Sequence, residues 1–266
     1  MISANMSTSI DVHDRRVLVT AGASGIGLAI AKKFRESGAR VHISDVSEDS
    51  LNCALSGVEG MTGTCGDAAS ASDADRVLDD VMSQLGGLDV LINNVGIAGP
   101  TGGIDTYTDA DVERTIDVNL KSHFYFLKRF VPLIKASAAR DSSIIAVGSV
   151  AGRLAYGFRT PYSATKWAIV GLIKSLAVEL GPVGVRVNAI LPGVVKGERM
   201  DHVIHDRATA LGVSDEEMTE TYLRKISLRR MVEADDIAHL ALFLSSDLGR
   251  NISGQAISVD GHVEYL

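Results

Sequence analysis

The sequence predicts an α/β protein with a doubly wound, parallel sheet of about seven strands and helices on both faces. The first observation is that short β-branched or apolar runs alternate with longer helical segments along nearly the whole chain. The second is that runs such as Val90-Leu91-Ile92 are continuously apolar, as strands covered on both faces must be. The third is a glycine cluster directly after the first predicted strand.

The expected strands follow in chain order, and residues 61–66 have the weakest pattern among them. The stronger patterns cover residues 16–20, 40–45, 88–93, 142–149, 185–191 and 255–260. In a doubly wound sheet, ligands bind beyond the carboxyl ends of the strands, where the strand order reverses. We therefore expect the functional residues just after strands.

Length and composition favour one domain that binds small molecules. The 266 residues fit a single α/β domain, and 46% hydrophobic and 22% charged residues are ordinary values for globular proteins. A formal net charge of -7 argues against binding to nucleic acid or to an anionic membrane surface. No apolar run is long enough to span a membrane. A cytoplasmic location is expected.

Residues 1–14 are expected to form a flexible tail, without the basic cluster and apolar stretch of a targeting signal, and residues 15–266 a single catalytic domain. Cys53 and Cys65 are too far apart for a CxxC site and are expected to be buried thiols. His202 and His205 lack further ligands nearby, so no metal site is expected.

Residues 196–227 interrupt the alternation with a long charged insertion after the strand at 185–191. Its pattern is helical around residues 200–211 and 215–226. A long excursion at the ligand-binding edge is usually a lid or a substrate lobe. Polar side chains in this insertion favour a polyol, a sugar or a hydroxy acid as substrate: Glu198, Arg199, Asp201 and Arg207.

The glycine cluster after the first strand is typical of a dinucleotide site. Its glycines let the backbone turn sharply and approach a ligand, and the N-terminus of the following helix offers free N–H groups to a pyrophosphate. The residues expected to contact the cofactor here are Gly22, Ser24, Gly25, Ile26 and Gly27. An ordinary strand-to-helix turn would explain the glycines alone, but the next strand adds a second signal.

Asp45 ends that strand, at about the 20-residue spacing of a ribose-binding acid. A carboxylate there accepts hydrogen bonds from the ribose hydroxyls and repels a 2′-phosphate. The sequence therefore favours NAD over NADP. Asp45 could also be a turn residue before Ser47. Arg40, the nearby cation that could favour a phosphate, starts the same strand and is expected to lie far from the ribose.

From residue 16 to about residue 261 the chain resembles the short-chain dehydrogenase/reductase family, whose motifs occur here in the family order. The glycine loop is similar to the family's TGxxxGxG, with Ala21 in place of the first glycine. The resemblance implies a single Rossmann-type domain. It also implies further cofactor contacts for the adenine and nicotinamide rings, at Asp67, Ala68, Asn93, Val95, Gly96, Pro192, Gly193 and Val195.

Tyr162 and Lys166 form a YxxxK motif, whose spacing puts both side chains on one face of a helix. A neighbouring ammonium and an oxidised nicotinamide ring both stabilise a phenolate, whose ordinary pKa is about 10. Alone, the two residues would be an ordinary helix pair. Ser149 ends an apolar strand at the edge where substrates bind, and its hydroxyl can hold the substrate oxygen. Asn119 resembles the family's fourth catalytic residue, which interrupts its helix.

The resemblance implies how these residues interconvert a secondary alcohol and a ketone. In oxidation, Ser149 orients the alcohol, Tyr162 takes its proton, and hydride passes from carbon to the nicotinamide ring. Lys166 also binds the nicotinamide ribose, and Asn119 with a water relays the proton outward. Reduction is the reverse. One alternative is a 3-oxoacyl-thioester reductase that uses NADPH; another is a dinucleotide-binding sensor without catalysis.

Two further features leave alternatives open. Arg159 either pairs with an anionic group of the substrate or is an interface or surface charge, and this second interpretation also applies to Arg153. The predicted helix over residues 161–180 is apolar around more than one face, and residues 123–134 contain an aromatic run. The resemblance implies a homotetramer in which these two segments pack against those of a neighbour.

Overall fold

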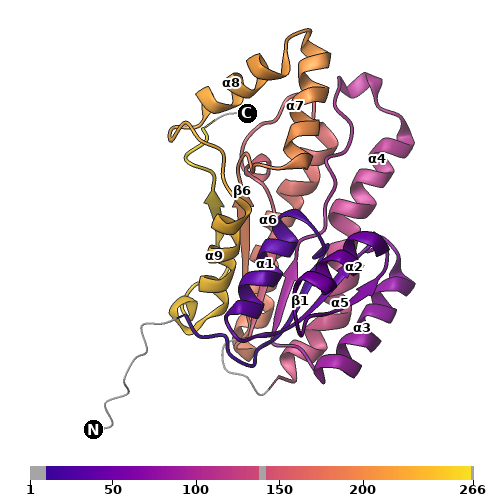
Figure 1. Cartoon of the computed structure of the whole chain (residues 1–266), viewed down its shortest axis with the longest axis vertical. Helices are drawn as coiled ribbons and strands as arrows, with labels where there is room; N and C mark the ends of the chain where they lie inside the picture. The colour runs from indigo at the N-terminus through magenta and orange to yellow at the C-terminus, as the bar shows by residue number, and fades with distance from the viewer. Residues whose placement is uncertain (1–9, 138–141, 265–266) are drawn as a thin grey trace.

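The computed structural model describes residues 10–137 and 142–264 and is built on one sheet in the order β3-β2-β1-β4-β5-β6-β7 (Figure 1). The strands are β1 (Arg16–Thr20), β2 (Arg40–Asp45), β3 (Thr62–Cys65), β4 (Val90–Asn93), β5 (Ser143–Val147), β6 (Arg186–Pro192) and β7 (Ala256–Val259). All neighbouring strands are parallel. The predicted doubly wound sheet is confirmed, and only strand ends are shifted.

Helices cover both faces of this sheet. They are α1 (Gly25–Glu36), α2 (Glu48–Gly57), α3 (Ala71–Leu85), α4 (Asp109–Ile116), α5 (Ser122–Lys135), α6 (Thr160–Leu180), α7 (Glu198–Leu211), α8 (Asp215–Lys225) and α9 (Ala234–Ser245). Shorter helical turns are η1 (Ile104–Thr106), η2 (Asp117–Lys121), η3 (Val150–Gly152), η4 (Gly181–Val183) and η5 (Asp247–Gly249). No helix in the described ranges combines the length and hydrophobicity needed to cross a bilayer.

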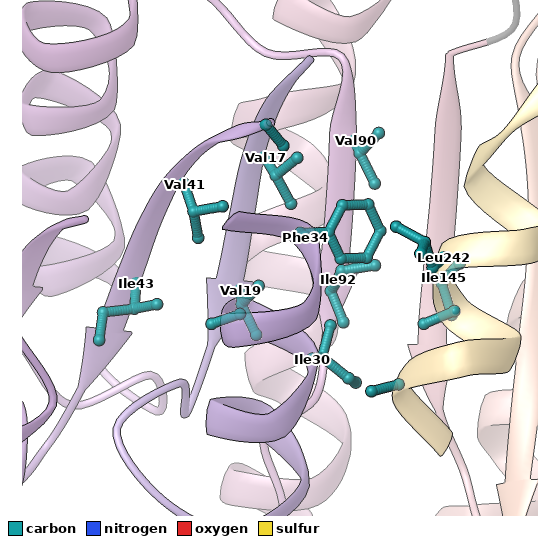
Figure 2. Close-up of a cluster of buried hydrophobic side chains, with 14 of the residues drawn as sticks. Val17, Val19, Ile30, Phe34, Val41, Ile43, Val90, Ile92, Ile145 and Leu242 are labelled. Atoms are coloured by element: carbon teal, nitrogen blue, oxygen red, sulfur yellow. The ribbon is translucent and has the colours of Figure 1, made fainter. Parts of the chain in front are cut away.

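Each face of the sheet has its own apolar core. Ile30 and Phe34, four residues apart on α1, turn to the same side and pack with Leu242 of α9 over the central strands (Figure 2). On the other face, Phe126 of α5 and Ile169 of α6 belong to the second core. Because both faces are covered, the strands between them are apolar throughout, as their sequences predict.

The strand order reverses between β1 and β4, which are hydrogen-bonded neighbours. The chain leaves β1 toward β2 and leaves β4 toward β5, so the loops after the two strands diverge. The glycine cluster follows β1, and Asn93 and Asn94 end and follow β4. The fold therefore brings these two motifs to one point at the carboxyl edge of the sheet.

The insertion at residues 196–227 forms α7 and α8 beyond the carboxyl end of β6 (Figure 1). The two helices enclose a small apolar core of their own, in which Ile204, Tyr222 and Ile226 are buried together with Val263 near the C-terminus. Ile226 and Val263 also form an antiparallel bridge. The C-terminal segment thus fastens this pair of helices to the rest of the domain.

The structure changes two expectations. Cys53 is exposed and Cys65 is half-buried, so the prediction of buried thiols is wrong. The reason is that α2 turns Leu51 and Ala54 toward the core and leaves Cys53 on its outer side. Within the predicted tail, Val12 is buried in the core beside α1. Residues 1–9 of that tail lie outside the described residues.

His42 is an ionisable side chain enclosed between strand and helix. Its two ring nitrogens lie 2.8 Å from Thr62 Oγ1 and 3.0 Å from Thr64 Oγ1. The Thr64 hydroxyl donates to Asp80 at 2.6 Å, so the ring donates to Thr64 and accepts from Thr62 as a neutral imidazole. Burial lowers the pKa of His42 from 6.5 to about 4, although the charge of Asp80 acts in the opposite direction.

This buried imidazole predicts loss of stability in acid. Between pH 6.5 and about pH 4 the unfolded chain binds a proton at His42, whereas the folded protein keeps this ring neutral. The contribution of His42 to the free energy of unfolding therefore has its full value above pH 6.5 and decreases as the pH falls toward 4. Between about pH 7.5 and about pH 5, the free energy of unfolding should fall by about 2 kcal/mol more in the wild type than in His42→Gln. Denaturant titrations measure both changes, and equal falls would contradict the prediction.

Candidate active site

The loop after β1 is held in an unusual backbone conformation. Ala21 and Gly25 both have positive φ, +48° and +50°. Ala21 therefore adopts the left-handed conformation that glycine would adopt more easily at the same place. A Cβ at Gly22 would lie 2.8 Å from Ile43, and one at Gly27 only 2.0 Å from the Ala21 carbonyl oxygen. Replacing the first motif glycine by Ala21 therefore leaves the turn intact, because Gly22 and Gly27 still let the backbone segments pack closely.

Asn94 fastens this loop from the neighbouring strand. Its side-chain amide donates to the carbonyls of Thr20 and Ala21 at 3.2 and 3.1 Å, and its backbone N–H donates to the Thr20 hydroxyl at 2.9 Å. Asn93, which the sequence predicts as a cofactor contact, is buried, and its amide donates to the His123 carbonyl at 3.3 Å. The Asn93 side chain also accepts a hydrogen bond from the Thr20 hydroxyl at 3.4 Å. Asn94, which the sequence reasoning left out, is the residue that bonds to both carbonyls of the loop.

The first turn of α1 is open to a ligand. Ser24 precedes the helix without a side-chain capping bond, and Ser24 and Gly25 are exposed. The N–H groups of this turn have no partner within the helix, and they favour an anion such as a pyrophosphate. The Asp45 carboxylate lies at the same loop, where it accepts hydrogen bonds from the backbone N–H of Ala23 and Ser47, both at 3.1 Å.

One cavity of about 450 Å³ joins the loop to the predicted catalytic group. Its size suits a small ligand. The predicted residues that line it are Ser24, Gly25, Ile26, Gly96, Ser149, Tyr162, Lys166, Pro192, Gly193 and Val195. Those that do not line it are Gly22, Gly27, Asp45, Asp67, Ala68, Asn93, Val95 and Asn119. The first group comes from the segments that follow β1, β4 and β5, from the end of β6, and from α6.

Three of the predicted contacts outside the cavity lining stand at the ends of β2 and β3. Asp45 ends β2, and Asp67 and Ala68 follow β3, which pairs with β2. The Asp67 carboxylate accepts a hydrogen bond from the Ala69 N–H at 2.9 Å and lies 3.4 Å from Arg114 Nη1. Arg40 lies at the other end of β2 and donates to the carbonyl of Gln84 at 2.8 Å. Arg40 and Asp45 thus lie at opposite ends of the same strand.

Ser149, Tyr162 and Lys166 meet at the floor of the cavity. Ser149 follows β5 and its hydroxyl forms a hydrogen bond to Tyr162, while also accepting one from the Ala151 N–H at 3.1 Å. Lys166 is buried on the same face of α6, where its ammonium group lies 5.8 Å from the centre of the Tyr162 ring. It donates to the Val147 carbonyl at 3.1 Å, which anchors it to β5.

Asn119 lies next to Gly96, as Lys166 does, and belongs to a distorted helical segment. It is fully buried within η2, a π-helical turn between α4 and α5. Its side chain accepts a hydrogen bond from the Ile97 N–H at 2.7 Å and donates to the Ile97 carbonyl at 3.0 Å. The predicted interruption of the helix is present, and π-turns of this kind are frequent at functional sites.

Opposing effects set the acidity of Tyr162. Burial alone would raise the pKa of this phenol, but the charges of Lys166, Arg199 and Arg159 and the hydrogen bond to Ser149 together lower it below its usual value of 10. For Lys166, burial lowers the pKa of the ammonium group, while the charge of the Tyr162 phenolate acts to raise it. The site thus favours a phenol that loses its proton more readily than a free tyrosine.

No three His, Cys, Asp or Glu side chains within residues 10–137 and 142–264 are grouped as metal ligands. His205 pairs with Asp215 at 3.1 Å, and both His202 and His205 are exposed on α7. The side chains of the site itself offer a phenol, a hydroxyl and nearby cations, from Tyr162, Ser149, Lys166, Arg159 and Arg199.

The sequence is similar to that of known proteins over nearly its whole length. Residues 20–263 match the family model described as enoyl-(acyl carrier protein) reductase. The chain is 34% identical to galactitol 2-dehydrogenase of Agrobacterium fabrum, over 94% of this chain and 97% of that protein. It is 30% identical to dehydrogenase/reductase SDR family member 4 of Homo sapiens, over 98% of this chain and 91% of that protein.

The structure is also similar to solved ones. A 3-ketoacyl-(acyl-carrier-protein) reductase from Brucella melitensis, solved in complex with NADH, superposes with a TM-score of 0.84. The two chains are 26% identical, and the match covers 95% of this chain and 98% of that one.

Proposed function

The chain belongs to the short-chain dehydrogenase/reductase family of oxidoreductases, and on that premise we propose that it interconverts a secondary alcohol and a ketone with NAD(H). The observation that carries this proposal is the single cavity shared by the glycine loop and the group Ser149, Tyr162 and Lys166. A dinucleotide and a small substrate that enter the same cavity can meet there.

The residues present fit a nicotinamide dinucleotide. The absent Cβ atoms of Gly22 and Gly27 permit the tight loop, the first turn of α1 presents free N–H groups, and Asp45 offers a carboxylate beside the loop. Pro192, Gly193 and Val195 line the cavity close to Tyr162. When bound, the nicotinamide ring supplies the acceptor or donor of hydride.

Tyr162 is the proposed proton acceptor in oxidation and donor in reduction. Its pKa is lowered by the positive charge of Lys166, so a base is accessible closer to neutral pH. Ser149, already hydrogen-bonded to Tyr162, is placed to hold the same substrate oxygen. Asn119 fixes the loop after β4 through Ile97 and is proposed to lie on the outward path of the proton.

Asp45 supports NAD over NADP. Its carboxylate is fixed at the glycine loop by two backbone N–H groups, and a 2′-phosphate placed beside it would meet like charge. A 3-oxoacyl-thioester reductase remains the second candidate, and its support is the likeness to the Brucella reductase. NADPH is the cofactor that the sequence leads us to expect for that alternative, but the Brucella reductase was solved with NADH. Turnover of a 3-oxoacyl thioester therefore separates the two candidates.

We also propose a homotetramer in the cytoplasm. The two helices expected at the interface, α5 and α6, carry exposed apolar side chains that water would otherwise contact. These are Phe124 on α5, and Trp167 and Val178 on α6.

The first test removes the phenol oxygen. Tyr162→Phe should keep NADH binding but lose at least about a thousandfold in kcat, because the general base and its hydrogen bonds are lost. NADH fluorescence measures binding, and absorbance of the reduced nicotinamide measures turnover. Tyr125→Phe makes the same change outside the cavity and should be neutral. A Tyr162→Phe enzyme with full activity would overturn the mechanism.

The pH profile tests the same residue. Oxidation requires the deprotonated phenol, so kcat/KM for the alcohol should rise with pH and level off below the usual tyrosine pKa of 10. A rise that continues beyond that value would show that the surrounding cations do not act on Tyr162.

Asp45→Ser tests the cofactor preference. Removing one negative charge beside the ribose should raise the ratio of kcat/KM with NADP to that with NAD by about tenfold or more, the equivalent of about 1.4 kcal/mol. Asp49→Asn removes a nearby exposed charge from α2 and serves as the control. An unchanged ratio in Asp45→Ser would remove Asp45 from the ribose site.

Light scattering tests the assembly. At micromolar concentration, the wild type should have about four times the mass of one chain, and Val178→Glu should lower that mass because a charge would be buried at the interface. A monomeric wild type would contradict the proposed interface.

A further inference from the structure

We propose that the substrate is a hydroxy acid, and its product an oxo acid, whose carboxylate binds to Arg159 beside the reacting carbon. This inference rests on the proposed function and narrows its substrate class. It begins from a guanidinium group that the catalytic steps above do not need.

Arg159 is built into the cavity wall. It is only 3% exposed, and its guanidinium carbon lies 5.6 Å from the centre of the Tyr156 ring and 5.2 Å from that of the Tyr162 ring. The preceding residue, Phe158, is held at a φ of +63°, a conformation that L side chains rarely adopt. The Phe158 carbonyl accepts a hydrogen bond from the Gly102 N–H at 3.0 Å, which fixes this turn.

The positive charge of Arg159 has no anionic partner in the described part of the chain. Its hydrogen bond there is from Nη2 to the Ala98 carbonyl at 2.5 Å, and the described residues form no ion pair with it. Its Nε is buried without an acceptor. Burying a charge without a counter-charge is costly, so a ligand that supplies one gains free energy on binding.

The rest of the cavity has the same sign. Arg199, on the first turn of α7, lines the opening and donates to the Gly96 carbonyl at 3.1 Å. Lys166 and Lys196 also line the cavity, against one acidic lining residue among the described ones, the exposed Glu198. A site with this balance attracts an anion and offers less to a neutral polyol.

The position of the guanidinium indicates where the anion stands on the substrate. Because Arg159 stacks beside the Tyr162 ring, a carboxylate bound to it lies close to the oxygen that Tyr162 deprotonates. A carboxylate one or two carbons from the alcohol carbon fits this spacing, and the planar fork of arginine matches a planar carboxylate. The carboxylate itself is unchanged: the O–H proton goes to Tyr162, hydride leaves the same carbon for the nicotinamide ring, and a C=O bond forms.

Matched acids and amides test this in the wild type. The probes are 2-hydroxybutyrate and 3-hydroxybutyrate, their primary amides, and galactitol as a neutral polyol, each with NAD. We expect kcat/KM for at least one acid to exceed that for its amide by tenfold or more. The inference would be overturned if each amide had the same kcat/KM as its acid, or if galactitol had a higher kcat/KM than both acids.

Variants then assign the preference to Arg159. Arg159→Met should reduce the ratio of acid to amide by about tenfold, Arg159→Lys should keep part of it, and Arg250→Met, which removes an exposed arginine outside the cavity, should leave it unchanged. Equal ratios in the wild type and Arg159→Met would overturn the assignment. Circular dichroism checks that each variant is folded.

A binding experiment covers the case in which Arg159→Met does not fold. Butyrate and butyramide have the same shape. The inhibition constant of butyrate as a competitive inhibitor of the wild type should be at least tenfold lower than that of butyramide. Equal inhibition would count against an anion site. If neutral probes are oxidised without preference for acids, only this inference fails; if no probe gives NADH absorbance, the proposed function fails as well.

Discussion

The hydrogen bonds between the ends of β1 and β4 are the constraint on which the rest of the site depends. Asn94 donates to the carbonyls of Thr20 and Ala21, and its N–H binds the Thr20 hydroxyl. These bonds cross the point where the strand order reverses. They fix the glycine loop to the segment after β4, which continues to Gly96. Lys166 is buried next to Gly96. The cofactor loop and the proposed catalytic group therefore keep one relative position.

Around that fixed point the site concentrates positive charge. Lys166, Arg159 and Arg199 approach Tyr162 from α6, from the residue before α6 and from α7. Their charges lower the pKa of the phenol, while burial opposes them. If the proposed anionic substrate binds to Arg159, it neutralises part of this charge. The same arginine would then couple the identity of the substrate to the acidity of the proposed base.

The part of the cavity that α7 and α8 line belongs to a separately packed unit. α7 and α8 have their own apolar core, closed by Val263, and do not add to the cores of the sheet. Tyr222 of α8 is hydrogen-bonded through its hydroxyl to that of Tyr156 at 2.6 Å. Changes in this unit can alter the cavity while the sheet and the cofactor loop stay the same.

The sequence alone determined the parallel sheet, its strands and part of the cavity lining, because these follow from local patterns: apolar runs, glycines at a turn, and the i, i+4 pair Tyr162 and Lys166. The family resemblance added Gly96, Pro192, Gly193 and Val195 to that lining. It also located Asn119 at a helix interruption through family resemblance. Burial was decided by tertiary structure. Whether Cys53 faces solvent depends on which side of α2 meets the sheet.

Arg159 shows the same limit at the site itself. Its sequence neighbourhood left a substrate ligand and a surface charge equally open, and only the packing of two tyrosine rings and the turn at Phe158 made it buried. Likewise, of the adjacent asparagines at the end of β4, Asn93 donates to the His123 carbonyl and Asn94 donates to the carbonyls of the glycine loop. Such outcomes depend on contacts between segments far apart in the chain, which local sequence patterns do not encode.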